Sequence, residues 1–285
     1  MPAKTKALPK NIRFWRCVVG SILLICAIWL VAANLKRPDP PPPVITDPPT
    51  TGPIQPTLPT PPLNPLGSND FAFREDYLTC LTAPSVLGID VSEWQTDIDW
   101  GKVKAAGIEF VMIRVGWRGS EKGLLTEDVS ARNHYAGASA AGLKIGAYFF
   151  SQAITPEEAV EEADFLLNIV KDWQLSMPAV YDWEYISADS RTGNMDADTL
   201  TACSKAFCDR VAAAGYEPMV YFNTSQSLTL LHLGELTDYK FWLAQYRTGL
   251  LYPYRVDMWQ YTETGSVPGI QGNVDINLYF PWEDA

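Results

Sequence analysis

Short apolar runs alternate with stretches of helical length from about residue 70 to the end of the chain. The apolar runs predict strands over residues 86–91, 108–115, 144–150, 179–185, 217–222, 240–246, 255–261 and 274–280. The stretches between them predict helices over residues 100–106, 126–141, 155–173 and 196–214. About eight strands alternating with helices favour an α/β fold with a parallel TIM-like barrel over an open sheet. Because helices become scarce in the last third, we expect an irregular (β/α) barrel.

The strand predicted over residues 179–185 ends in two acids. Side chains at positions i and i+2 of a strand point to the same face, so Asp182 and Glu184 should project together, with Cα atoms roughly 6–7 Å apart. Such a pair is typical of a glycan-cleaving site, in which one acid stays protonated while its neighbour stays charged. Acids this close leave little space for a water molecule between them, which favours retention at the anomeric carbon.

Polar residues also stand at the ends of the other predicted strands. Barrel enzymes carry their chemistry at the C-terminal ends of the strands. Those ends are, in chain order, Asp90, Arg114, Tyr148, Asp182 with Glu184, Tyr221 with Asn223, Gln245, Gln260 and Asp275. A single acid at a strand end is more often a helix cap or a loop hydrogen bond than a catalyst. The repeated pattern, however, predicts a polar ring of the kind that surrounds a bound sugar.

The first 68 residues differ in composition from the rest of the chain. Residues 1–16 are basic, residues 17–35 are mostly apolar, and residues 36–68 are rich in proline and threonine. We expect a cytoplasmic tail, a single transmembrane signal anchor and an extended linker, followed by a catalytic barrel over residues 69–285. The alternative to an anchor is a signal peptide that is cleaved near Ala33. The barrel is extracellular in both cases, held at the cell membrane in the first and secreted in the second.

Charge and cysteine content exclude several classes of function. The formal charge of the chain is −11, and because residues 1–68 carry a net charge of +5, the barrel carries −16. An acidic domain repels phosphate backbones, so we expect no nucleic-acid partner. The two histidines lack zinc-ligand spacing and no glycine-rich phosphate loop follows the first strand, so we expect no metal and no cofactor. The sequence allows either a disulfide bond from Cys80 to Cys203 or Cys208, or three free thiols. We expect a monomer.

Five ordered motifs carry a family resemblance. They are GIDVSEWQ at residues 88–95, YDWE at 181–184, WLAQY at 242–246, MWQY at 258–261 and GSVPGIQGNVDIN at 265–277. Together they resemble glycoside hydrolase family 25, the lysozymes that cleave peptidoglycan as N-acetylmuramidases. The resemblance covers roughly residues 85–280. It implies an irregular barrel whose acids match Asp90, Asp182, Glu184 and Asp275. Some members have a histidine after the tyrosine of the third strand, where this chain has Phe149; that histidine is not expected to be catalytic.

The four acids are expected to have unequal roles. Glu184 is the expected general acid, because burial and the neighbouring charge of Asp182 would raise its pKa. Asp182 is expected to stay ionised and to stabilise positive charge at the anomeric carbon, as a nucleophile or by steering the substrate's N-acetyl group. Asp90 and Asp275 become neighbours only if the barrel closes. Their charges would then shift the pKa values of Asp182 and Glu184, and their carboxyls would bind sugar hydroxyls. A hydrogen bond that clasps the barrel seam is the alternative role for Asp275.

Four further residues are candidates for substrate binding. Tyr148, Tyr221 and Gln245 are expected to contact sugars, with core packing as an alternative of similar weight for Tyr221 and Gln245. Arg114 is expected to hold either Asp90 or Asp182 in the ionised form.

These features predict a lysozyme that cleaves the β-1,4 bond between N-acetylmuramic acid and N-acetylglucosamine in the bacterial cell wall. The expected partners are the glycan strands of peptidoglycan and, through the N-terminal helix, the membrane. Two alternatives remain open. One is a barrel that binds wall glycan without cutting it, and the other is a hydrolase of a related acetamido-sugar polymer such as chitin.

Overall fold

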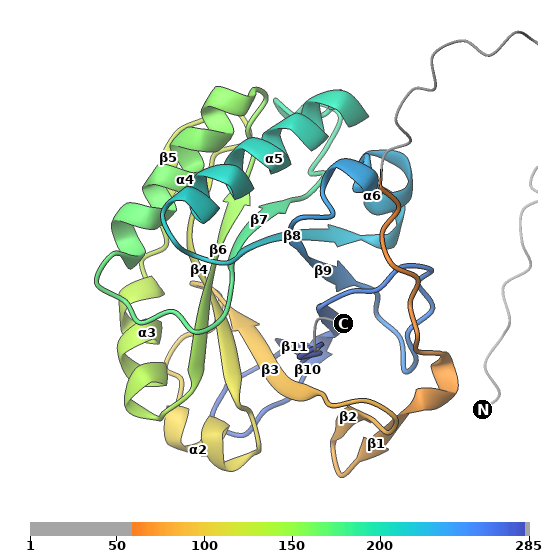
Figure 1. The fold of residues 1–285 in the computed structure, drawn as a ribbon. Coiled ribbons are helices and arrows are strands. Elements are labelled where there is room, and N and C mark those ends of the chain that lie inside the picture. Colours follow the sequence, from red (N-terminus) through yellow and green to blue (C-terminus); the bar gives the residue numbers. More distant parts are fainter. Residues whose placement is uncertain (1–58, 283–285) are drawn as a thin grey trace, which may run out of the picture. The chain divides into compact units, whose positions relative to one another are not determined.

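Eight strands close into a barrel in the computed structural model, which describes residues 59–282. Around the barrel they are β3 (Val86–Val91), β4 (Phe110–Arg118), β6 (Lys144–Ser151), β7 (Ala179–Trp183), β8 (Pro218–Asn223), β9 (Lys240–Ala244), β10 (Met258–Gly265) and β11 (Val274–Tyr279). β3 pairs with both β4 and β11, which completes the ring (Figure 1). The predicted α/β barrel is therefore confirmed.

One strand runs against the others, which the sequence did not predict. β3, β4, β6, β7, β8, β9 and β10 form parallel pairs, whereas β11 is antiparallel to both β10 and β3. A parallel connection needs a crossover of a dozen or more residues. The connection over residues 266–273 is too short for one, so the chain turns back and β11 fills the last place in the ring in the reversed direction.

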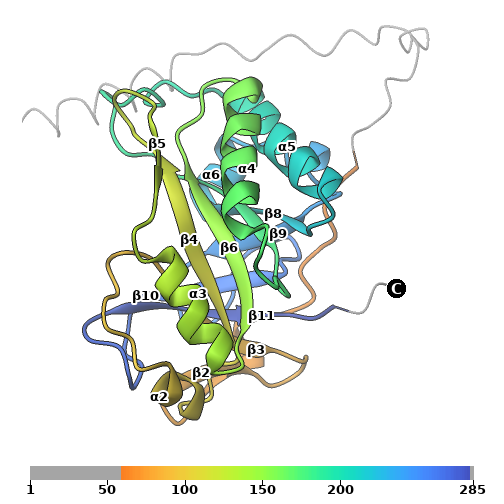
Figure 2. The same ribbon diagram turned by 90° about the vertical axis from the view of Figure 1, so that its left-hand side faces the viewer.

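Helices cover the outside of the barrel on one side only. They are α2 (Trp100–Ala105), α3 (Ala131–Ala140), α4 (Pro156–Val170) and α5 (Ala197–Ala213), and Figures 1 and 2 show the last three along the outer face of β4–β8. α6 (Thr224–Thr229) and the 3₁₀ turns η1 (Ser68–Asp70) and η2 (Leu233–Glu235) are short. α4 begins as the sequence predicts, because Thr155 Oγ1 accepts the N–H of Glu158 at 3.3 Å. The last strands lack a helical cover, as the irregular pattern indicated.

One predicted helix was wrong, and one hairpin was not predicted. Residues 126–141 do not form one helix, because Leu125–Glu127 forms a short strand, β5, antiparallel to β4, and α3 begins only at Ala131. Between them Asp128 Oδ1 accepts the N–H of Ser130 at 2.9 Å, which gives the chain a local turn in place of a helical one. The hairpin β1 (Phe71–Arg74) and β2 (Tyr77–Cys80) precedes the barrel and was not predicted.

Strand alternation divides the apolar side chains into two groups. The outer group packs between the strands and the helices. The inner group fills the base of the barrel with Phe110, Met112, Tyr148, Met177, Val180, Met219, Tyr221, Trp242, Ala244 and Met258. A Cβ added to Gly88 of β3 would lie 2.3 Å from the ring of Phe110, so the close fit of this base requires glycine there. The remaining inward positions lie above this base and are largely polar.

The predicted segments 1–16 and 17–35, and most of the linker over 36–68, lie outside the described residues. Within residues 59–282 no helix combines the length and the apolar character that crossing a membrane requires. The described end of the linker lies against the barrel domain, where Leu63 forms a β-bridge with Tyr254 and Arg255 N donates to Pro62 O at 2.7 Å. Cys80, Cys203 and Cys208 are buried free thiols, so no bridge joins them.

Candidate active site

A cleft of ≈ 390 Å³ opens above the apolar base of the barrel. Its lining consists of Asp90, Ser92, Trp94, Gln95, Arg114, Tyr148, Phe150, Asp182, Glu184, Tyr221, Trp242, Tyr246, Gln260, Glu263 and Asp275. Every candidate residue predicted from the sequence lines this cleft except Gln245. The structure therefore brings together side chains from all parts of the barrel, because the strand ends meet at one rim.

Strand alternation places Asp182 of β7 and Glu184, the residue after its end, in the cleft. Tyr181 and Trp183 pack in the outer core, so the alternate residues Asp182 and Glu184 face the interior. Asp182 is 4% exposed and its Oδ1 has no hydrogen-bond partner within the described residues. Glu184 follows the last residue of the strand and is less deeply buried, nearer the mouth.

Both acids of this pair have raised pKa values. Burial raises the pKa of Asp182 well above its ordinary value, and the charge of Glu184 raises it further. Burial also raises the pKa of Glu184, with contributions from the charges of Asp90 and Glu263. The ionised state expected for Asp182 stays a prediction, which burial opposes and the charge of Arg114 favours. The two carboxyls titrate as a unit, and positive charge on a bound sugar would favour ionisation of Asp182.

Asp90 and Asp275 form the second acid pair. They are register partners across the β3–β11 seam. Burial and the charge of Asp90 raise the pKa of Asp275 to about 9, so Asp275 keeps its proton at neutral pH. The protonated carboxyl of Asp275 is a hydrogen-bond donor to Asp90. Asp90 also accepts hydrogen bonds from Asn277 Nδ2 at 2.7 Å and from Gln260 Nε2 at 3.1 Å. These donors favour the ionised form of Asp90 against the opposing effect of its burial.

Asp275 reaches the cleft by a route that the sequence analysis misjudged. It stands at the beginning of β11, not at the end of a strand. Because β11 runs antiparallel to its neighbours, its beginning lies at the same rim as the C-terminal ends of the other strands. Asp275 and Asp90 are register partners across the barrel seam, so the two roles given for Asp275, a clasp of the seam and electrostatic tuning, both stay predictions that this position allows.

Arg114 lines the cleft, but its ion pairs are with other acids than those predicted. Its Nε lies 2.8 Å from Asp128 Oδ2 and its Nη2 lies 3.0 Å from Glu93 Oε1. The side chain of Asp128 is fully buried, so this pair fixes the guanidinium in place. The positive charge of Arg114 still lowers the pKa of Asp182, against the stronger effect of burial.

Of the predicted sugar contacts, the two tyrosines line the cleft and the glutamine does not. Tyr148 and Tyr221 each pack edge-on against Trp242, and the Tyr221 hydroxyl donates to Gln260 Oε1 at 3.1 Å. Gln245 Nε2 instead donates to Thr224 Oγ1 at 3.0 Å, and Gln245 Oε1 accepts the N–H of Leu251 at 2.8 Å. Gln245 therefore fastens the loop that follows β9.

Several residues of the cleft, and Asn277, which contacts Asp90, were not singled out from the sequence. Trp94 is 78% exposed beside the acids, and Glu263 adds a further carboxyl. Tyr246 donates its hydroxyl to Gln260 Oε1 at 3.2 Å, and Asn277 holds Asp90. Trp94, Tyr246 and Asn277 all lie inside the motifs that carry the family resemblance, so those motifs held the signal that could have found them.

A buried hydrogen-bond network fixes the backbone at Glu184. Gln152 Nε2 donates to the carbonyl oxygen of Glu184 at 3.0 Å, and Thr192 Oγ1 donates to Gln152 Oε1 at 2.6 Å. On the preceding residue, Gln226 Nε2 donates to the carbonyl oxygen of Trp183 at 3.3 Å. These amides hold the end of β7 and thereby set the position of the acid.

The side chains that line the cleft make it an acidic site. Within residues 59–282, no three or more His, Cys, Asp and Glu side chains are grouped so as to hold a metal ion. Hydrolysis of a glycosidic bond uses two neighbouring carboxyl groups, one to donate a proton and one to act as a carboxylate. A pair of carboxyls at the mouth of this barrel can take these two roles.

The family comparison agrees with the class of enzyme that the fold and cleft define. The model of glycosyl hydrolases family 25 matches residues 89–270, and the chain belongs to this family. Among curated proteins, the chain is 29% identical over 196 residues to an autolytic lysozyme of Clostridium acetobutylicum, a match of 67% of this chain and 55% of that protein. It is 27% identical over 206 residues to lysozyme M1 of Streptomyces globisporus, a match of 68% of this chain and 67% of that protein.

Solved structures give the same result. The modular autolysin LytC of Streptococcus pneumoniae, solved in complex with a synthetic peptidoglycan ligand, superimposes with a TM-score of 0.60 at 28% identity. That match covers 69% of this chain and 47% of LytC. A lysozyme of Streptomyces coelicolor superimposes with a TM-score of 0.57 at 26% identity, covering 70% of this chain and 93% of that one. The chain thus matches about half the length of the autolytic lysozyme and of LytC.

Proposed function

We propose that the barrel is a peptidoglycan hydrolase that cleaves the β-1,4 bond between N-acetylmuramic acid and N-acetylglucosamine. The observation that carries this proposal is the placement of Asp182 and Glu184, two neighbouring acids with raised pKa values, in one cleft of a family 25 barrel. Relatives that are named lysozyme or N,O-diacetylmuramidase support the choice of substrate.

Glu184 is the proton donor in this mechanism. Burial and the charges of Asp90 and Glu263 raise its pKa, which favours the protonated form that can deliver a proton to the oxygen of the leaving sugar. Its position at the mouth lets it reach a bond that spans the cleft. The network through Gln152 holds its backbone and so limits the orientations that the carboxyl can take.

Asp182 stabilises the positive charge that develops at the anomeric carbon. Its Oδ1 is buried and without a hydrogen-bond partner in the described part of the chain, so it is available to the substrate. The developing charge of the sugar lowers the pKa of Asp182 at the moment when a carboxylate is needed. Asp182 acts as a nucleophile or by steering the N-acetyl group of the substrate, and both routes retain the anomeric configuration.

The test of this proposal incubates the full chain with purified bacterial cell walls and measures new reducing ends. We expect release by the wild type and a loss of at least about 100-fold for Glu184→Gln, which removes the transferable proton. Tight binding to walls without release would favour a glycan-binding barrel. Equal release from walls and from chitin would favour the broader acetamido-sugar hydrolase.

We also propose that the chain is a monomer anchored in the cell membrane, with its barrel outside the cell. The support is the basic stretch 1–16 followed by the apolar stretch 17–35 and the proline-rich linker, all read from the sequence. Carbonate extraction of membranes tests the anchor, since a cleaved signal peptide would give protein that starts near Ala33 and is found only in the medium. Light scattering in detergent tests the monomer.

A further inference from the structure

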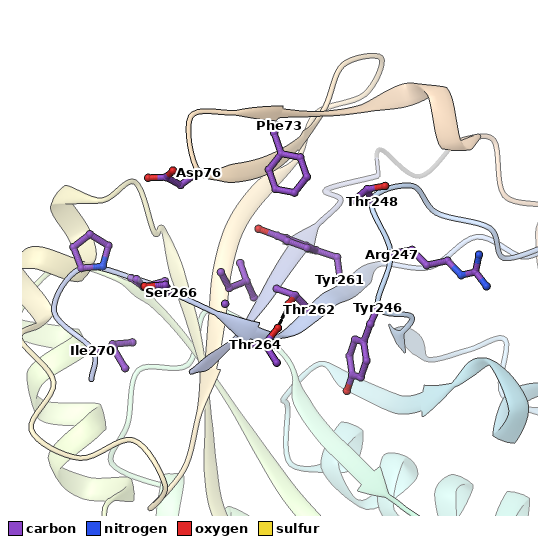
Figure 3. A pocket seen from close by; sticks show the side chains of 14 residues that line it. Phe73, Asp76, Tyr246, Arg247, Thr248, Tyr261, Thr262, Thr264, Ser266 and Ile270 are labelled. Carbon is purple, nitrogen blue, oxygen red and sulfur yellow. Dashed lines mark hydrogen bonds between the residues drawn. The ribbon is translucent and has the colours of Figure 1, made fainter. Parts of the chain in front are cut away.

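A second and larger cavity lies beside the catalytic cleft. Its volume is ≈ 840 Å³, against ≈ 390 Å³ for the cleft. It is formed by the β1–β2 hairpin, by the segment that follows β9, and by the end of β10 with the connection to β11 (Figure 3). Phe73 points from the hairpin across this cavity towards Tyr261 (Figure 3). We call this cavity the branch groove, for the role argued below.

The branch groove and the cleft meet at Tyr246, which lines both. The Tyr246 hydroxyl donates to Gln260 Oε1 at 3.2 Å, on the side of the acids. Strand β10 also separates the two cavities, because Glu263 lines the cleft while Thr262 and Thr264 on either side of it line the groove. A substituent on a ligand in the cleft therefore has to pass only one side chain to enter the groove.

The two cavities differ in chemistry. The cleft contains a concentration of carboxyls. The groove combines threonine and serine hydroxyls with apolar surface from Phe73 and the β10–β11 connection, and its lining includes one acid, Asp76, and one base, Arg247. Arg247 is exposed and forms no salt bridge with any residue between 59 and 282. A carboxylate would be repelled by the acids of the cleft and attracted by this guanidinium.

The groove also offers the edge of a strand. β9 pairs with β10 only from Met258 to Gln260, whereas β10 continues to Gly265 with β11 on its other side. Along residues 261–265 no strand of the described chain occupies the β9 side. The N–H of Thr264 is bonded to Thr262 Oγ1 at 3.1 Å. Peptides are commonly bound along such edges.

We propose that the branch groove binds a peptide substituent carried by the glycan strand in the cleft, with a carboxylate of the peptide at Arg247. This inference rests on the proposed function, because only a peptide-bearing glycan presents both parts together. The short alkyl groups of the peptide lie against Phe73, and its amide groups face the hydroxyls and the open strand edge. The β1–β2 hairpin that forms one wall lies before residues 89–270, the range of the family match.

The test compares kcat/KM of the full chain on glycan strands with and without their peptides. The variants are Phe73→Ala and Arg247→Gln, and the matched controls are Leu124→Ala and Lys122→Gln, which alter exposed residues away from the groove. We expect each groove variant to lose roughly tenfold on peptide-bearing strands only, the size of one charge-assisted or apolar contact. Equal losses on both substrates, or no loss on either, would overturn the proposal.

A binding measurement separates this proposal from the proposed function. Calorimetry with Glu184→Gln compares a disaccharide that carries a peptide with the bare disaccharide. We expect tighter binding of the peptide form, reduced by Arg247→Gln. If the wild type cleaved neither substrate but this preference persisted, the hydrolase proposal would fail and the groove proposal would stand. If cleavage occurred and the two disaccharides bound equally well, the groove proposal would fail alone.

Discussion

Replacing Asp275 with asparagine removes one titrating proton from the cleft and keeps a hydrogen-bond donor next to Asp90. In the wild type, burial and the charge of Asp90 raise the pKa of Asp275 from 3.8 to about 9. Between these two values the folded chain holds a proton that the unfolded chain has released. The free energy of unfolding therefore falls as the pH rises through this window, by up to about 1.4 kcal/mol per pH unit from this group alone. The decrease in the free energy of unfolding ends once the pH exceeds the pKa of Asp275 in the folded chain.

The variant Asp275→Asn should lose this component of the pH dependence. Urea unfolding at a series of pH values from neutrality to about 9 gives the free energy of unfolding for both proteins. We expect the variant to gain stability relative to the wild type as the pH rises, with a difference that grows by about 1 kcal/mol per pH unit. Asp172→Asn, at an exposed site, controls for the change in net charge. If the free energies of unfolding of wild type and Asp275→Asn changed in parallel with pH, the raised pKa of Asp275 would be refuted.

Three further variants test the supports of the site. Asn277→Ala removes the 2.7 Å hydrogen bond to Asp90 and should lower the free energy of unfolding by about 2–4 kcal/mol in urea titrations; a loss below about 1 kcal/mol would contradict this role. Gln152→Ala frees the carbonyl of Glu184 and should reduce kcat roughly tenfold with little change in KM, whereas a change in KM alone would show that the network does not position the acid. Trp94→Ala should raise KM several-fold at unchanged stability, because this exposed ring faces the cleft, and an unchanged KM would exclude a substrate contact.

The barrel and its acid pair could be predicted because both depend on local patterns. Period-two alternation places Asp182 and Glu184 on one face whatever the partners of the strand are. The reversed direction of β11 has no such local signal, since it depends on the length of the preceding connection and on the closure of the ring. The pairing of Asp90 with Asp275 was expected from closure of the ring, but it also requires the reversed direction of β11, which brings the beginning of that strand to the end of β3.

Residues whose role depends on loop geometry were the least predictable. Gln245 and Tyr246 are adjacent in the sequence, yet the first fastens a loop and the second lines the cleft. Arg114 points into the cleft as expected, but its ion partners, Asp128 and Glu93, come from segments outside the predicted strand ends. The branch groove depends on a hairpin that lies against the barrel, and contacts of this kind between distant segments leave no periodic trace in the sequence.

The most direct test of the account is the chemical identity of the new chain ends. Purified peptidoglycan is digested with the full chain or with Glu184→Gln, reduced with borohydride and analysed by mass spectrometry. The account predicts fragments that end in reduced N-acetylmuramic acid with the wild type and almost none with the variant. Fragments that end in reduced N-acetylglucosamine, or equal release by the variant, would contradict it.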